Sequence, residues 1–571
     1  MNMKSFISFI KSSLKEINPW QNIKILHTNI RGDVLSGITV AIIALPLALA
    51  FGEISQLGPE AGIWSAVVGG IIGGLFGGCI VGVSGPTAPM ASQIAAFMGA
   101  FVIGSTNEPD LIAAFSIIFL SGLILVAISM LKISRFIHYI PYSAIAGFMC
   151  GIGLIIIFSQ INPFLGLESK RNIYDVFNNF QYTLQNINVD ALYVSLPSLF
   201  IVLSWSFLEH RFKLLSNIPS PLIALIVGTS IAYFLNLDIH YIGDKMNSNG
   251  DSKIFSFYVP DLTRLGQFIM PAFLLAGLAI IDSLLSCKVA DNMTGRHHSS
   301  DRETFGQGLA NMFAGLLGGI STATATTQTV GNITFGAKTP LATIVKGLVM
   351  LSVLFGLGHI VATIPTACLA AILFKLGIDI LDYRILPILR KIPITDLLIF
   401  IIVLLITVFQ NLMVAVIVGF IFACIRFFKE IKFTWNSNLN HKIIPFSESD
   451  FSFEKDQNNE LKNLPINVLE PHGPLFFGSV EPLRNIYAKS SKHEVLIIDM
   501  SYITMIDLSG IYTIEDIINI AKTKNIQVFV TNTKNNIKKT LEKVDFIKNV
   551  GDDYQSSKSS IKSIILNRYN F

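Results

Sequence analysis

Val83-Ser84-Gly85-Pro86-Thr87-Ala88-Pro89 is a short polar break in a strongly apolar part of the chain. A second break of the same kind is Gly318-Gly319-Ile320-Ser321-Thr322-Ala323-Thr324-Ala325-Thr326-Thr327-Gln328-Thr329. Each break follows a glycine-rich apolar segment and precedes a short one. Paired, interrupted hydrophobic segments in matching positions of two halves indicate a binding site at a repeat interface in a membrane transporter.

Each break predicts a helix that starts in the middle of the membrane. Such a start leaves about four backbone N–H groups without helical partners and carries roughly half a positive charge. Two such ends facing each other can bind an anion without a buried Arg or Lys. Pro86 and Pro89 suit a helix start, and Thr87 adds a hydroxyl. The alternative interpretation is that the small residues only allow close helix packing.

The sequence around the breaks predicts fourteen membrane spans in two groups of seven, because a span needs about 20 mostly apolar residues. The breaks open the third and tenth spans. The first group covers 33–53, 62–82, 86–104, 111–131, 137–161, 191–209 and 218–237. The second covers 268–289, 304–320, 325–340, 341–364, 366–381, 394–410 and 411–428.

Charge supports a membrane protein with both termini in the cytoplasm. Of the 571 residues, 51% are hydrophobic and 14% are charged, whereas a soluble chain carries about 25% charged residues. Lys and Arg gather in the N-terminal tail, after the last span and in the loops that follow even-numbered spans. The net charge of +4 is too small to indicate nucleic-acid binding. We expect a bacterial inner-membrane protein in contact with lipid.

Asp282 lies well inside the eighth predicted span. A central Asp costs about 2.5–3.5 kcal/mol on insertion scales, so it is a functional candidate. Ser286 lies one helical turn later on the same face. A carboxylate with hydroxyls and carbonyls suits Na⁺, or the carboxyl can carry a proton; the alternative is a structural Asp. Lys346 also lies in an apolar run, where we expect it to be structural or to extend to the interface.

The composition changes near residue 435. We expect a cytoplasmic N-terminal segment at 1–32, a transmembrane domain at 33–430, a linker at 431–464 and a soluble α/β domain at 465–571. In that last domain, apolar runs at 475–477, 495–499 and 528–531 alternate with helical patterns at 509–523 and 534–543.

Several motifs resemble the SulP inorganic anion transporters, and within them the sodium-dependent bicarbonate branch. The resemblance covers nearly the whole chain. The C-terminal domain resembles a STAS domain. The motifs are Ala44-Leu45-Pro46-Leu47-Ala48-Leu49-Ala50-Phe51-Gly52, Gly85-Pro86-Thr87-Ala88-Pro89-Met90, Ile281-Asp282-Ser283-Leu284-Leu285, Val289-Ala290-Asp291-Asn292-Met293-Thr294-Gly295, Leu496-Ile497-Ile498-Asp499-Met500-Ser501 and Ile506-Asp507-Leu508-Ser509-Gly510.

The resemblance implies two inverted seven-span repeats, divided into core and gate domains, and a homodimer. It implies an anion site at Thr87, Ala88 and Ala325, and a Na⁺ site at Asp282, Ser286, Thr324 and Thr326. Many members of the family have Arg in the tenth-helix segment, where this chain has Gln328, a further substrate-site candidate.

Together these features favour Na⁺-coupled bicarbonate uptake by alternating access, with no cofactor besides the coupling ion. The alternatives are proton-coupled transport of sulfate or another oxyanion, an anion channel, and a membrane-anchored signalling protein. No nucleophile–base set or metal cluster in the sequence indicates an enzyme.

Overall fold

A computed structural model describes residues 18–409, 414, 418 and 441–568, apart from short gaps and nine longer ones. The longer gaps are 104–107, 135–141, 169–172, 212–219, 245–256, 357–361, 382–393, 450–463 and 552–557. The chain forms two compact units, of which one holds most of the membrane helices and the other includes the C-terminal domain.

Helices occupy the first thirteen predicted spans, whereas the fourteenth, 411–428, lies almost wholly outside the described residues. In the first group they are α3 (Ile30–Ile54), α4 (Pro59–Val68) with η2 (Gly69–Gly73) and α5 (Gly74–Phe76), α6 (Ala88–Met98), α7 (Leu111–Met130), α8 (Tyr142–Ser159), α12 (Val189–Arg211) and α13 (Ser220–Leu235). In the second they are α15 (Leu265–Thr294), α16 (Ser300–Leu317), α17 (Thr326–Thr334), α18 (Leu341–Gly356), α20 (Thr366–Ile380) and α21 (Ile394–Phe409).

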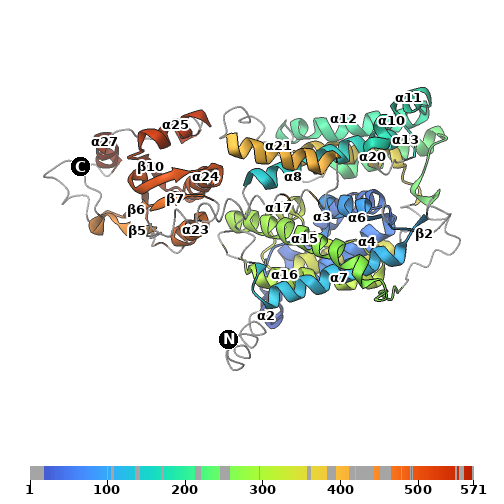
Figure 1. Cartoon of the computed structure of the whole chain (residues 1–571), viewed down its shortest axis with the longest axis horizontal. Coiled ribbons are helices and arrows are strands. Elements are labelled where there is room, and N and C mark those ends of the chain that lie inside the picture. Colours follow the sequence, from blue (N-terminus) through green and yellow to red (C-terminus); the bar gives the residue numbers. More distant parts are fainter. Residues whose placement is uncertain are drawn as a thin grey trace. The chain divides into compact units, whose positions relative to one another are not determined.

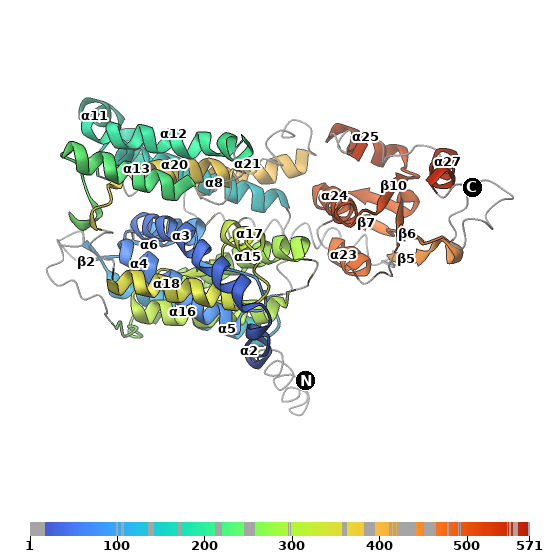
Figure 2. The same cartoon turned by 180° about the vertical axis from the view of Figure 1, so that it is seen from behind.

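Two groups of helices are recognisable in the membrane unit. In one, α3, α4, α7, α15, α16 and α18 pack closely, and in the other α12 packs along α13 and α20 (Figures 1 and 2). Glycine allows some of these close contacts. A Cβ on Gly62 of α4 would lie 1.8 Å from the Ala48 carbonyl oxygen of α3, so no larger residue fits there without moving a backbone.

The second predicted span ends earlier than expected, because the helix stops at Phe76. Its middle turn, η2, is a π-helix, and the following Gly77 is extended, with ψ of 156°. The glycines at 69, 70, 73, 74, 77 and 78 favour this irregular geometry, since glycine loses the most conformational freedom in a helix.

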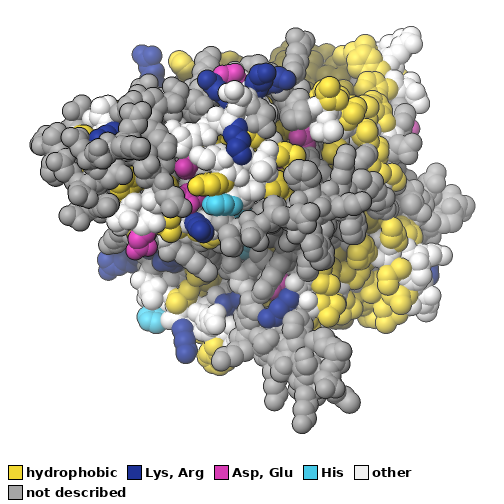
Figure 3. Space-filling model, turned by 60° about the vertical axis from the view of Figure 1, so that its left-hand side comes forward, with side chains coloured by type: hydrophobic (Ala, Val, Ile, Leu, Met, Phe, Trp, Pro, Cys, Tyr) yellow, Lys and Arg dark blue, Asp and Glu magenta, His cyan; other side chains and the backbone are white. Residues whose placement is uncertain are grey.

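Large apolar side chains are exposed on the membrane helices. Phe200 and Phe207 of α12 and Phe234 of α13 are 72, 71 and 79% exposed. Among the residues that the structure describes, five helices are long and apolar enough to cross a membrane: Trp20–Ile54, Pro59–Phe76, Leu111–Met130, Tyr142–Phe164 and Leu265–Asp291. Hydrophobic side chains gather in the right-hand part of Figure 3, whereas most charged ones in view lie elsewhere. These exposed side chains fit a surface that contacts lipid.

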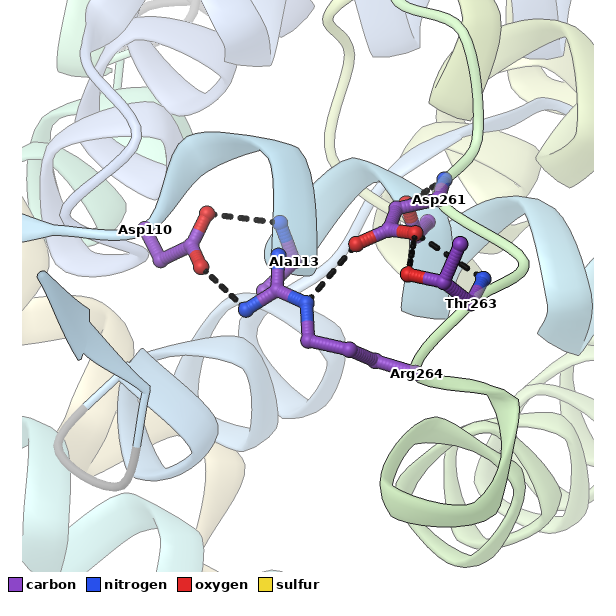
Figure 4. Close-up of polar contacts among 6 residues, drawn as sticks. Asp110, Ala113, Asp261, Thr263 and Arg264 are labelled. Atoms are coloured by element: carbon purple, nitrogen blue, oxygen red, sulfur yellow. Dashed lines mark hydrogen bonds and ion pairs between the residues drawn. The ribbon is translucent and has the colours of Figure 1, made fainter.

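A polar cluster ties the start of α15 to the start of α7 (Figure 4). Arg264 donates from Nη1 to Asp110 and from Nε to Asp261, at 2.7 Å each. Asp110 also accepts from the Ala113 amide and so caps α7. Hydrogen bonds from Thr263, and then from Arg264, lower the pKa of Asp261 to about 2. The cluster therefore fixes the N-terminal end of the helix that carries Asp282.

The C-terminal domain contains a four-stranded sheet in the order β10-β8-β6-β5. The strands are β10 (Gln527–Thr531), β8 (Val495–Asp499), β6 (Ile466–Glu470) and β5 (Lys442–Pro445), with β7 (Gly473–Leu475) paired to β9 (Ile503–Ile506). Strands β10, β8 and β6 are parallel to one another, and the edge strand β5 is antiparallel to β6. Helices are α23 (Val480–Ala488), α24 (Leu508–Thr523), α25 (Asn535–Lys543) and α27 (Lys558–Arg568).

The sheet has a hydrophobic core on each face, because successive strand residues point to opposite sides. Leu496 and Ile498 pack with residues of α24 and α25 on one face, and Val495 and Ile497 pack with Ile561 of α27 on the other. The structure differs from the expected linker at β5, which lies within 431–464 yet pairs with β6 along four residues. The hydrogen bonds between β5 and β6 make β5 part of the C-terminal domain.

Candidate functional site

The two sequence breaks form a short antiparallel pair of strands. β1 (Ser84–Pro86) pairs with β4 (Thr322–Thr324) so that Ser84 lies opposite Thr324 and Pro86 opposite Thr322. The Ala325 amide extends the ladder by donating to the Val83 carbonyl at 2.9 Å. The pairing satisfies backbone groups that would otherwise be exposed inside the membrane. It also brings segments 240 residues apart in the sequence side by side.

A helix begins directly after each strand. α6 begins at Ala88 and α17 at Thr326, as the breaks predict. The carbonyls of Thr87 and Ala325 accept the first helical hydrogen bonds, from the amides of Ala91 and Thr329. Ala325 has no side chain that could cap α17. The first amides of these helices are therefore available to a negatively charged ligand.

Asp282 of α15 lies against the start of α6. The Thr87 hydroxyl donates to Asp282 Oδ2 at 2.7 Å, and the Thr87 side chain is only 6% exposed. This contact joins a residue of the expected anion site to a residue of the expected Na⁺ site. Asp282 also lies in α15 beside β4, because the neighbouring Ser283 hydroxyl accepts from the Thr324 amide at 3.0 Å.

The other expected Na⁺ ligands lie close by. Ser286 Oγ and Thr326 Oγ1 are 2.7 Å apart, and the Ser286 hydroxyl donates to the Asp282 carbonyl at 2.9 Å. The hydroxyl of Thr324, by contrast, donates to Glu303 of α16. A cation beside Asp282 would therefore find the hydroxyls of Ser286 and Thr326, whereas the hydroxyl of Thr324 is already engaged.

Ala88, Ala325 and Gln328 complete the sequence candidates. Ala88 and Ala325 are buried and lie at the two helix starts: α6 begins at Ala88, and Ala325 directly precedes α17. Gln328 lies in the first turn of α17 and is 1% exposed. Its Oε1 has no hydrogen-bond partner among the residues that the structure describes. This arrangement leaves the amide able to contact a ligand.

Sequence reasoning missed a buried polar network beneath the two strands. Gln307 Nε2 lies 2.6 Å from Ser84 Oγ, 2.9 Å from Thr324 Oγ1 and 2.9 Å from Glu303 Oε1. The second Glu303 oxygen accepts from the amides of Gly78 and Cys79. The available signal in the sequence was Glu303, which directly precedes the ninth predicted span, and Gln307, one helical turn later inside that span.

Lys346 of α18 belongs to this network and does not extend to the interface. Its side chain is 0% exposed, and Nζ donates to the carbonyls of Ser84 at 2.9 Å and Ala66 at 3.2 Å. Of the two roles expected for Lys346, structural or extending to the interface, the structure supports the structural one, because the ammonium finds its acceptors, the carbonyls of Ser84 and Ala66, inside the helix group.

A separate cavity of about 280 Å³ opens at the C-terminal end of α3. Its lining includes Glu53, Gln160, Glu168, His240 and Asp244. Glu53 thus lies in this cavity wall, whereas Asp282, Thr87 and the helix starts do not contribute to it.

The site combines two kinds of chemistry. Free amides at helix starts attract an oxyanion, and hydroxyls can donate to it. A carboxylate flanked by hydroxyl oxygens suits a hard cation such as Na⁺ or can hold a proton. We find no group of three or more His, Cys, Asp or Glu side chains arranged for a transition metal in the described parts of the chain.

Comparison with protein families gives two matches. Residues 30–403 match the sulfate permease family, and residues 459–560 match the STAS domain. The first match covers more than half of the chain and includes both strands and Asp282.

Similar curated proteins match over nearly their full length. The chain is 34% identical to the bicarbonate transporter BicA of a Picosynechococcus species, over 96% of both chains. It is 32% identical to the bicarbonate transporter BicA of a Synechocystis species, over 95% of this chain and 96% of that protein. It is 27% identical to the putative sulfate transporter YvdB of Bacillus subtilis, over 91% of this chain and 95% of that protein.

Solved structures agree with the fold. The transmembrane domain of a cyanobacterium bicarbonate transporter BicA matches with a TM-score of 0.59 and 34% identity, over 68% of this chain and 98% of that one. The structure of SLC26A9 matches with a TM-score of 0.63 and 19% identity, over 95% of this chain and 91% of that one. The second likeness concerns the fold alone.

Proposed function

We propose that this chain, which belongs to the sulfate permease family and carries a STAS domain, transports bicarbonate together with Na⁺. The family and the relatives are membrane transporters, so the chain is a multi-pass anion transporter and not an enzyme. Its fold class, a helical transporter with a C-terminal STAS domain, agrees with the sequence prediction. Bicarbonate is favoured over sulfate because the relatives named as bicarbonate transporters are the more similar ones.

The observation that carries Na⁺ coupling is the 2.7 Å hydrogen bond from Thr87 to Asp282. It joins the anion-binding helix start to the acidic residue of the cation site. Without a cation, the Thr87 hydroxyl is held by the carboxylate. When Na⁺ binds Asp282, the cation neutralises the carboxylate and the hydroxyl can turn toward the anion. Na⁺ thereby raises the affinity for bicarbonate, and bicarbonate must raise the affinity for Na⁺ by the same factor.

Residue roles follow from this scheme. Bicarbonate is bound by the amides at the starts of α6 and α17, with help from Thr87 and Gln328. Na⁺ is bound by Asp282, Ser286 and Thr326, and Thr324 can offer its carbonyl since its hydroxyl bonds to Glu303. No covalent chemistry is needed. Transport requires only that the doubly occupied site be exposed alternately to the two sides.

The transport cycle involves motion between two helix groups. We assign α3, α4, α6, α7 and α15–α18 to the core and α12, α13 and α20 to the gate, since each set packs mainly within itself. The protein is a homodimer of the bacterial inner membrane with both termini in the cytoplasm, and the STAS domain assists assembly. Cross-linking in intact membranes and protease access to the C-terminal domain test these points.

Uptake by proteoliposomes tests the function. Purified protein is reconstituted, and uptake of labelled bicarbonate and labelled sulfate is measured with and without an inward Na⁺ gradient. We expect bicarbonate uptake that depends on Na⁺ and is lost in Asp282→Asn. Sulfate uptake that does not depend on Na⁺ but responds to a proton gradient would contradict the proposal and favour a proton-coupled oxyanion transporter; YvdB is one relative named as a putative sulfate transporter.

A further inference from the structure

A buried ammonium lies beside the strand that leads into α6. Lys346 Nζ donates to the Ser84 carbonyl at 2.9 Å, and a Cβ added to Gly85 would lie 2.9 Å from the same nitrogen. The absence of a side chain at Gly85 therefore lets the ammonium approach the backbone. Among the described residues, no carboxylate forms an ion pair with Lys346, so its charge is not cancelled by direct contact.

The helices at the anion site contain no basic residue of their own. Neither α6 nor α17 has Lys or Arg in its sequence. Their attraction for an anion rests on backbone dipoles, which act mainly within the first turn. The nearby carboxylates of Asp282 and Glu303 work against an anion. A positive charge beneath β1 offsets them.

We propose that Lys346 is a positioning residue that supplies positive charge to the anion site. This inference rests on the proposed function. The ammonium does not contact the anion but lies under the strand that ends at the anion-binding helix start. It acts in two ways: it holds the Ser84 carbonyl, and its field raises the affinity of the helix starts for the anion.

The size of the effect follows from distance. Thr87 lies three residues beyond Ser84, which in an extended chain corresponds to about 10 Å. Two unit charges that far apart, at an effective dielectric constant of about 20, attract each other enough to change affinity roughly tenfold. Loss of the charge should therefore raise the KM for the anion about tenfold.

Three substitutions separate the charge from the hydrogen bond. Lys346→Gln keeps a donor for the Ser84 carbonyl but removes the charge, Lys346→Met removes both, and Lys346→Arg keeps both. We expect KM to rise about tenfold in the Gln and Met variants and to rise much less in the Arg variant. Melting temperature and elution in detergent identify variants that fail to fold.

Gly85→Ala provides a second perturbation in which Lys346 itself is not substituted. The added Cβ displaces the ammonium, and we expect a rise of a few-fold in KM. Gly277→Ala on α15 is the matched control, because a Cβ there meets no atom within 4 Å. An unchanged KM in Gly85→Ala and Lys346→Gln would overturn the proposal.

The Na⁺ dependence distinguishes a charge effect from a packing defect. Removing a positive charge weakens anion binding but cannot weaken cation binding by electrostatics. In Lys346→Gln, at saturating anion, the half-saturating Na⁺ concentration should stay the same or fall. If both the KM for the anion and the half-saturating Na⁺ concentration rose, Lys346 would be a merely structural residue and the inference would be overturned.

The assay uses whichever labelled anion, bicarbonate or sulfate, the unsubstituted protein transports. Sulfate transport alone would contradict the proposed function and still test Lys346, since its charge attracts either anion. Bicarbonate transport with an unchanged KM in Lys346→Gln would overturn the role of Lys346 alone.

Discussion

Thr87→Val should uncouple the anion from Na⁺. Valine has nearly the shape of threonine but lacks the hydroxyl that donates to Asp282 at 2.7 Å, at a position that is only 6% exposed. A hydrogen bond to a charged group contributes about 1.5–3 kcal/mol, which corresponds to roughly a 10- to 150-fold change in affinity. In the proposed scheme the Thr87 hydroxyl donates to the carboxylate before Na⁺ binds and to the anion afterwards, so its hydrogen bond then stabilises the bound anion.

The assay is anion uptake by proteoliposomes at a series of Na⁺ concentrations. In the unsubstituted protein KM should fall as Na⁺ rises. In Thr87→Val, KM should be at least about tenfold higher at saturating Na⁺ and should respond little to Na⁺.

Thr343→Val in α18 is the matched control for this substitution. Thr343 is equally buried, but its Oγ1 has no hydrogen-bond partner among the described residues, so valine should leave transport unchanged. If Thr87→Val kept the full response of KM to Na⁺, the hydrogen bond would not be the link between the two ions and the reasoning would be refuted.

Three further predictions concern the fold. Gly62→Ala should destabilise the protein by about 3 kcal/mol, because the added Cβ would lie 1.8 Å from a carbonyl oxygen of α3. Gly277→Ala, whose Cβ meets no atom within 4 Å, should be tolerated. Melting curves compare the two variants, and equal curves would contradict the packing of α3 against α4. Arg264→Gln should lower the melting temperature by the same amount at pH 5 and pH 8, because Asp261, with a pKa of about 2, stays ionised until the pH approaches that value; a pH-dependent difference would argue against the cluster. Burial lowers the pKa of His441, so the neutral imidazole stabilises β5 above a pH of about 6.5 and this contribution is lost as the pH falls below it; hydrogen exchange of β5, corrected for intrinsic rates, should therefore accelerate in acid in the unsubstituted protein but not in His441→Ala.

The helix starts and Asp282 could be predicted from the sequence because the membrane makes such residues costly. A polar break or a carboxylate inside a span stands out against about 20 apolar neighbours. The pairing of β1 with β4 could not be predicted, since three-residue strands of Ser, Gly, Thr and Ala have no hydrophobic period. The same holds for β5, a four-residue strand between polar segments.

The role of Lys346 depends on tertiary packing. The sequence places the residue in an apolar run but does not reveal which side of α18 faces another helix. The acceptors of its ammonium, the carbonyls of Ser84 and Ala66, lie more than 260 residues away in the sequence. Likewise, the hydroxyl of Thr324 was expected at the Na⁺ site, and only the position of Glu303 shows that it is engaged elsewhere.

Simultaneous uptake of radioactive Na⁺ and labelled bicarbonate by the same proteoliposomes tests the central claim most directly. The account predicts that bicarbonate added outside accelerates Na⁺ entry, that Na⁺ accelerates bicarbonate entry, and that Asp282→Asn abolishes both effects. The account would be contradicted if bicarbonate entered at the same rate without Na⁺, or if the rate of Na⁺ entry did not change when bicarbonate was added.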